Sequence, residues 1–166
     1  DASKLAIGDA QYSCFPNEEN GIVDDLICYK IKENQYLLVV NAGNIEKDWN
    51  WISKYNEEFK ADLKDLSEDY SLLAIQGPKA VEAMQSLSSL DLAAIPFYKF
   101  KVGDFAGIEN VIISATGYTG SGGFEIYCKN SEVVQIWNKV FEAGASFGIK
   151  PIGLAARDTL RLEMGY

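Results

Sequence analysis

Residues 10–41 read AQYSCFPNEENGIVDDLICYKIKENQYLLVVN and contain three apolar stretches separated by two polar turns. The stretch 10–15 is rich in apolar and aromatic residues, the stretch 22–31 carries β-branched residues, and residues 16–21 between them have the composition of a hairpin connection. The third stretch, 35–41, follows a turn-like Lys-Glu-Asn and is almost continuously apolar, which predicts a buried central strand. Two successive hairpins favour an antiparallel sheet over parallel strands joined by helical crossovers.

The remaining sequence continues this mixture of hairpins and helices. We expect helices at 44–59, 78–87, 131–144 and 153–164, the first capped by Asn44, and strands at 63–66, 70–76, 97–102, 108–115 and 124–128. Hairpins outnumber crossovers in this order. The sequence therefore predicts an α+β fold with antiparallel sheets and helices packed on one face. A polar break near 67–70 suggests two lobes, 1–68 and 69–166.

The composition suits a folded protein and excludes some functions. Hydrophobic residues make up 48% of the 166 residues and charged residues 23%, which is enough for a core. No apolar run is long enough to cross a bilayer. With 15 basic and 24 acidic residues the net charge is −9, which argues against non-specific nucleic-acid binding.

Histidine is absent, so any proton transfer in this segment must use Asp, Glu, Tyr, Lys or Cys, and no His-ligated metal site can form. The three cysteines, Cys14, Cys28 and Cys128, form no CxxC pair, which predicts buried free thiols in a reducing compartment. The chain begins with Asp1, without an initiator Met, signal peptide or transit peptide, and it ends on a helical pattern. We therefore expect both ends to be cuts through a longer protein.

The first candidate for chemistry is the adjacent pair Asp24 and Asp25 inside the apolar strand 22–31. Two carboxylates there are costly to bury without partners. Strand alternation places them on opposite faces, so one is expected to face water and the other a cavity, where a carboxylate is a proton acceptor. Tyr29 lies four residues beyond Asp25 and shares its face. The alternative is that the pair ends a hairpin at the surface.

The second candidate is the segment 116–126, TGYTGSGGFEI, with four glycines in the seven residues 117–123. Glycines let the backbone approach a ligand closely or adopt positive φ. The segment does not match a phosphate loop, because no Lys-Ser/Thr follows and a strand comes next. Tyr118 offers an aromatic face, and Glu125 offers a carboxylate that can accept two parallel N–H bonds from an amidine-like edge. The alternative is a loop that only joins two strands.

The third candidate is the helix at 153–164, where Arg157 and Arg161 share one side. A guanidinium can hold a carboxylate bidentately. The alternative is a solvated helix face on which Asp158 and Arg161 pair locally. We expect Trp137, in the preceding helix, to belong to the core.

Taken together, six segments in order resemble the aminomethyltransferase (T-protein) family of the glycine cleavage system: 11–13, 21–27, 39–42, 73–78, 115–126 and 151–165. The resemblance covers essentially the whole chain and implies the family's folate-binding fold, without its N-terminal segment and C-terminal β-barrel domain. One departure is Ser121, where the family often has Glu or Asp.

The resemblance implies a transferase of glycine catabolism that takes an aminomethyl group from the lipoylated H-protein and gives methylene-tetrahydrofolate and ammonia. By position, Asp25 matches the essential aspartate, although Asp24 remains an alternative. Tetrahydrofolate is the one-carbon acceptor, and no metal is implied. Cytoplasmic location is expected, or the mitochondrial matrix in a eukaryote. The folate-lining positions are Tyr12, Ile27, Tyr29, Tyr118, Glu125 and Arg157, with Glu125 orienting the pterin.

Three alternatives stay open. The first is a folate-dependent demethylase of the same superfamily. The second is a non-catalytic folate-binding repair or assembly protein, although the Lys-Gly-Cys-Tyr-x-Gly-Gln segment of such relatives is absent here. The third is that these 166 residues form a lobe with no activity of their own.

Overall fold

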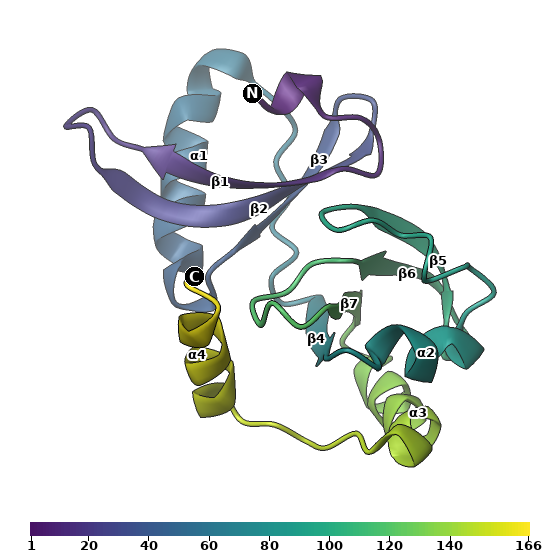
Figure 1. Ribbon diagram of the computed structural model, residues 1–166. Coiled ribbons are helices and arrows are strands. Elements are labelled where there is room, and N and C mark those ends of the chain that lie inside the picture. The colour runs from purple at the N-terminus through teal and green to yellow at the C-terminus, as the bar shows by residue number, and fades with distance from the viewer. The chain divides into compact units, whose positions relative to one another are not determined.

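The computed structural model describes residues 1–166 and is drawn in Figure 1. The chain forms two compact units, Asp1–Glu68 and Asp69–Tyr166. Each unit has its own antiparallel sheet. No helix is both long and apolar enough to cross a membrane.

The first unit is built on a three-stranded sheet. Its strands are β1 (Ala10–Pro16), β2 (Ile22–Lys32) and β3 (Gln35–Val40), in the order β1-β2-β3. The two expected hairpins are therefore present. The prediction that the third strand is central is wrong, because β2 pairs on both sides and β3 lies at an edge with no fully buried residue. An apolar run indicates a strand, but it does not decide the strand's place in the sheet.

Helix α1 (Ile45–Phe59) follows β3 through a short 3-10 turn, Ala42–Asn44. Asn44 is the N-cap residue as predicted, but its side chain makes no capping hydrogen bond. The helix ends at Lys60, which has a left-handed conformation with φ 53°. The predicted strand at 63–66 is wrong, because this segment has no regular secondary structure. Leu63 and Leu66 are three residues apart, a spacing that does not repeat on one face of a strand.

The second unit contains a four-stranded sheet in the order β4-β7-β6-β5, with every pair antiparallel. Its strands are β4 (Tyr70–Gln76), β5 (Phe100–Phe105), β6 (Ile108–Ser114) and β7 (Gly123–Lys129). Its helices are α2 (Ala80–Met84), α3 (Val133–Gly144) and α4 (Leu154–Glu163). Strand β5 begins three residues later than the predicted 97–102 and ends three residues later, at Phe105.

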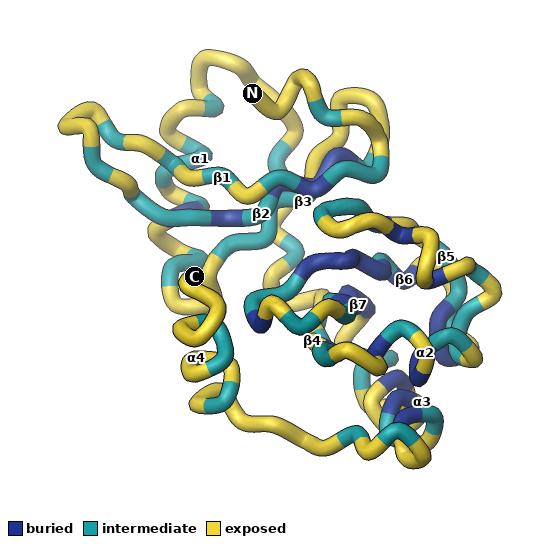
Figure 2. The backbone as a smooth tube through the Cα atoms, viewed as in Figure 1, coloured by how far each residue is buried: buried dark blue, intermediate teal, exposed yellow.

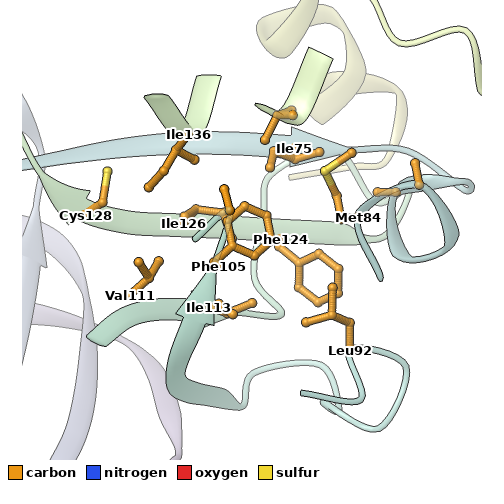
Figure 3. Close-up of a cluster of buried hydrophobic side chains, with 14 of the residues drawn as sticks. Ile75, Met84, Leu92, Phe105, Val111, Ile113, Phe124, Ile126, Cys128 and Ile136 are labelled. Atoms are coloured by element: carbon orange, nitrogen blue, oxygen red, sulfur yellow. The ribbon is translucent and has the colours of Figure 1, made fainter. Parts of the chain in front are cut away.

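The core of the second unit lies between the sheet and helices α2 and α3 (Figure 3). Phe124 and Ile126 of β7 point into it together with Ile136 of α3, and all three are almost completely buried. Figure 2 shows the buried positions concentrated along β6, β7 and one side of α3. The predicted α+β fold, with antiparallel sheets and helices on one face, is confirmed.

Trp137 corrects one expectation about this core. Its side chain is 45% exposed, whereas its neighbour Ile136 and Val140, one helical turn further, are buried. Successive residues in a helix differ by about 100° in direction, so Ile136 and Val140 share the inner face and Trp137 turns away from it. The sequence pattern identified the helix, but the prediction that Trp137 belongs to the core is wrong.

Candidate functional site

A carboxylate held by two donors lies in the sheet of the first unit. The Tyr12 hydroxyl donates to Asp25 Oδ2 at 2.5 Å, and Asn41 Nδ2 donates to Asp25 Oδ1 at 2.6 Å. Tyr12 pairs with Ile27 across β1 and β2, so it is a diagonal neighbour of Asp25 on the sheet. Asn41 follows the last residue of β3. The two flanking strands thus fix both oxygens of the predicted catalytic residue.

Asp24 and Asp25 are less separated than strand alternation predicted. Asn41 Nδ2 also donates to Asp24 Oδ1 at 3.1 Å and to the Asp25 carbonyl at 3.2 Å. The β1–β2 register shifts between Phe15 and Pro16, opposite this part of β2, and such irregularities redirect side chains. One amide therefore links the two carboxylates. Asp25 faces Tyr12, whereas Asp24 extends toward α1.

On α1, Asp48 has a fully buried side chain, and neither of its oxygens has a hydrogen-bond donor. Burial, followed by the nearby Asp24 carboxylate and its charge, raises the pKa of Asp48 to about 6. Burial also opposes ionisation of Asp24, but the polar groups around it, among them the Asn41 amide that donates to it, lower its pKa on balance. Sequence reasoning missed Asp48 because an acidic residue in an amphipathic helix is normally expected to face water.

We expect Asp48→Asn to stabilise the protein at neutral pH. Between pH 4 and 6 native Asp48 keeps a proton that the unfolded chain releases near its ordinary value of 3.8, so its contribution to stability is lost as pH rises. Asparagine cannot ionise, so the variant should exceed the wild type by about 1–3 kcal/mol at pH 7.5 and match it near pH 4. Urea unfolding at several pH values measures the difference. A difference that does not vary with pH contradicts the prediction.

A second carboxylate is held in the sheet of the second unit. The Thr116 hydroxyl donates to Glu125 Oε2 at 2.5 Å and lies 2.9 Å from Ser114 Oγ, which can donate to it in turn. Ser114 and Glu125 are paired residues of β6 and β7. Glu125 points away from the buried Phe124 and Ile126 because neighbouring strand residues alternate in direction. Thr116 was not predicted as a member of this site.

Gln76, at the end of β4, holds the glycine-rich loop against the sheet. Its amide donates to the Thr116 carbonyl at 3.2 Å and to the Phe124 carbonyl at 3.1 Å, and it accepts from the Thr119 hydroxyl at 2.9 Å. A cavity of about 230 Å³ lies beside this loop. Its lining includes Gln76, Phe97, Thr116, loop glycines and Tyr166. The loop is therefore a fixed wall of a small cavity rather than a plain connection.

The Tyr118 ring is engaged by the C-terminal segment. It stacks on Tyr166, with ring centroids 5.6 Å apart and an interplanar angle of 9°. Arg157 Cζ lies 4.6 Å from the Tyr118 centroid, and Arg161 Cζ lies 5.8 Å from it. The two arginines do share one side of α4. Arg161 also pairs with Asp158 at 3.7 Å, which is the local pairing that the sequence allowed.

The remaining predicted site residues differ in accessibility. Tyr12 is 58% exposed and Ile27 is partly buried, so both offer surface to a ligand. Tyr29 is completely buried, and its role in lining the folate site stays a prediction. It lies in β2, the central strand of its sheet, next to the buried residues Cys28 and Lys30.

The cysteines and acidic residues form no metal site. No three His, Cys, Asp or Glu side chains gather closely enough to hold an ion. All three cysteines are free, as expected, but Cys14 is exposed and not buried, because it lies on the outer side of edge strand β1. Burial raises the pKa of Cys28, and burial with the charge of Glu132 raises that of Cys128. Both stay protonated at neutral pH.

The structure is an antiparallel α+β domain with two fixed carboxylates. Asp25 is held by a hydroxyl and an amide donor, and Glu125 is held by a hydroxyl donor. The chain belongs to the GCVT N-terminal domain family, whose model matches residues 1–166. It is 70% identical over its whole length to an aminomethyltransferase of Flavobacterium psychrophilum, covering 46% of that protein. It is 61% identical to one of Bacteroides fragilis, over 98% of this chain and 45% of that protein. The resemblance inferred from the sequence is confirmed.

Solved structures agree with this assignment. The glycine cleavage system aminomethyltransferase T of Bartonella henselae matches all of this chain and 43% of its own, with a TM-score of 0.81 and 33% identity. A heterotetrameric sarcosine oxidase from Corynebacterium matches with a TM-score of 0.62 and 16% identity, which shows a shared fold alone. The chain spans about half the length of the curated relatives it matches.

Proposed function

We propose that the protein carrying this chain transfers an aminomethyl group from the lipoylated H-protein to tetrahydrofolate, giving methylene-tetrahydrofolate and ammonia in glycine cleavage. The proposal is supported by the match of all 166 residues to proteins named aminomethyltransferase. The observation that carries it at the level of chemistry is the Asp25 carboxylate, which is oriented by Tyr12 and Asn41. We place the reaction in the cytoplasm, because these relatives are bacterial and the cysteines are free thiols.

In this proposal Asp25 accepts the proton that a folate amine loses as it attacks the aminomethyl carbon. Over the whole reaction that carbon forms bonds to two folate nitrogens and loses its bonds to the lipoyl sulfur and to the amino nitrogen. The two protons lost by the folate amines leave with the lipoyl thiol and with ammonia. Position and electrostatics supply the acceleration, since two donors hold the carboxylate in one orientation before the substrate arrives. Ile27 and the exposed face of Tyr12 line the same region. No step in this scheme needs a metal, and none is proposed.

Glu125 has a different role, which is to orient the pterin. Thr116 occupies its Oε2, so the carboxylate is already fixed when it meets the parallel N–H groups of a pterin edge. Arg157 of α4, which lies over the Tyr118 ring, is proposed to pair with a ligand carboxylate. Tyr118 then supports the guanidinium from below, in addition to offering aromatic surface.

The decisive experiment is an assay of a protein of the relatives' full length that contains these residues. With lipoylated H-protein loaded with the aminomethyl group, we expect ammonia and methylene-tetrahydrofolate in equal amounts. Activity on a small methylated amine without H-protein would favour the folate-dependent demethylase instead. Folate binding without any turnover would favour the non-catalytic alternative.

We expect Glu125→Ala to weaken tetrahydrofolate binding by about 10- to 100-fold, which corresponds to one or two charge-assisted hydrogen bonds. Calorimetric titration measures this directly. Glu109→Ala is the matched control, because Glu109 is an exposed residue of β6 in the same sheet. Equal affinities of the two variants would remove Glu125 from the folate site.

A further inference from the structure

Asp48 is a fully buried ionisable group that the proposed reaction does not use. Neither Asp48 oxygen has a hydrogen-bond donor, and Asp24 Oδ2 beside it has none either. A buried carboxylate without partners costs several kcal/mol, and two adjacent charged carboxylates add repulsion to that cost. If Asp24 and Asp48 are both ionised, their unpartnered oxygens and their mutual repulsion therefore destabilise the folded state.

The charged groups around Asp48 relieve only part of this cost. The positive charge of Lys47, the preceding residue of the helix, lowers the pKa of Asp48, but Lys47 Nζ donates to the Val23 carbonyl at 2.7 Å and not to Asp48. The charged groups that face Asp48 from β2 are Asp24 and Asp25, and both are acidic. A metal does not fit either, because no three suitable ligands gather here.

One proton resolves the arrangement. Carried by Asp48, it is donated to the Asp24 carboxylate, so that a previously unpaired oxygen on each residue gains a partner. The burial of these unpartnered oxygens and the closeness of the two carboxylates favour this shared state. The second oxygen of Asp24 is already occupied, because Asn41 Nδ2 donates to Oδ1 at 3.1 Å.

The same Asn41 amide reaches the proposed catalytic carboxylate at 2.6 Å. The contacts therefore run from the buried acid on α1 through Asp24 and Asn41 to Asp25. We infer that Asp48 is a positioning residue, whose proton shared with Asp24 fixes the Asn41 amide and through it the orientation of Asp25. This inference rests on the proposed function, which makes Asp25 the reacting group.

The shared proton can be measured without any assay of turnover. In a chain labelled with ¹³C-aspartate, the Asp48 carboxyl resonance is followed from pH 4 to 8 and assigned with Asp48→Asn. We expect its midpoint to lie at least one pH unit above 3.8, the ordinary value of an aspartate, and the Asn41 side-chain amide to shift with the same midpoint. In Asp48→Asn the Asn41 shift should disappear. Titration of Asp48 at the ordinary aspartate value, or an unmoved Asn41 amide, would overturn the inference.

Kinetics test the positioning role in the full-length protein. Asparagine at position 48 still donates an N–H to Asp24, so Asp48→Asn should keep kcat within about threefold. Asp48→Leu removes the donor and should lower kcat at least tenfold while KM for tetrahydrofolate changes less than twofold. The ratio of wild-type to Asp48→Asn kcat should fall as pH rises through the Asp48 midpoint.

The outcomes separate this inference from the proposed function. If Asp48→Leu keeps wild-type kcat while Asp25→Asn is inactive, only the positioning role fails. If Asp25→Asn is itself fully active, the proposed function fails. Should Asp48→Leu not fold, the wild-type Asn41 titration alone decides for or against the shared proton.

Discussion

Asp25→Asn is expected to lower turnover by roughly 100-fold or more while tetrahydrofolate still binds, because general-base catalysis by a positioned group contributes about 10²- to 10⁴-fold. Asparagine has nearly the shape of aspartate and can still accept from Tyr12 and contact Asn41. It cannot accept the proton of the attacking amine. The loss should therefore fall on kcat rather than on KM. Steady-state assays with loaded H-protein, together with calorimetric folate titration, measure both quantities.

Two further variants make this result specific. Asp62→Asn removes an equally negative side chain from an exposed position of the same unit and should leave kcat unchanged. Tyr12→Phe removes only one of the two donors to Asp25 and should have an intermediate effect. An Asp25→Asn protein with the turnover of Asp62→Asn would end the assignment of Asp25 as the proton acceptor.

The fold was predictable where local pattern and pairing agree. The turn-forming residues 16–21 between two apolar-rich stretches specified the first hairpin, which the structure contains as β1 and β2. Sequence alone could not place β3 at an edge, because edge and centre differ in neighbours and not in local pattern. The prediction for Trp137 was wrong for a similar reason. Several apolar residues lie on α3, and packing against the sheet decides which side of the helix is buried.

The candidate site was predictable in its carboxylates and not in what holds them. Asp25 and Glu125 stood out because charges inside apolar strands are unusual. Asn41 and Thr116 have ordinary residue types at strand ends, and their roles depend on the register between strands. Asp48 was hidden because a polar residue in an amphipathic helix is normally assumed to face water. Asp48 lies within one helical turn of the apolar residues Ile45, Trp49 and Ile52, and this spacing was the signal in the sequence that it could be buried.

The glycine-rich loop provides the second large effect. Gly123 has φ +119°, and a Cβ added there would lie 2.2 Å from the Ile75 carbonyl oxygen and 2.8 Å from Gln76 Cα. These are backbone atoms of the paired strand β4, which cannot move aside as a side chain could. Gly123→Ala should therefore destabilise the protein by about 2–4 kcal/mol, from overpacking together with the unfavourable φ. Urea or thermal unfolding measures the loss.

Gly122→Ala is the matched control, because Gly122 also has positive φ, +74°, but a Cβ there would meet nothing within 4 Å. Its cost should be about 1 kcal/mol, from backbone conformation alone. The comparison separates two reasons for glycine that the sequence could not distinguish, conformational freedom and close approach. At position 123 the close neighbour is the protein's own strand, so the substitution should weaken folding before it affects any ligand. Equal destabilisation by the two variants would mean that β4 yields at this contact, and that positive φ alone explains both glycines.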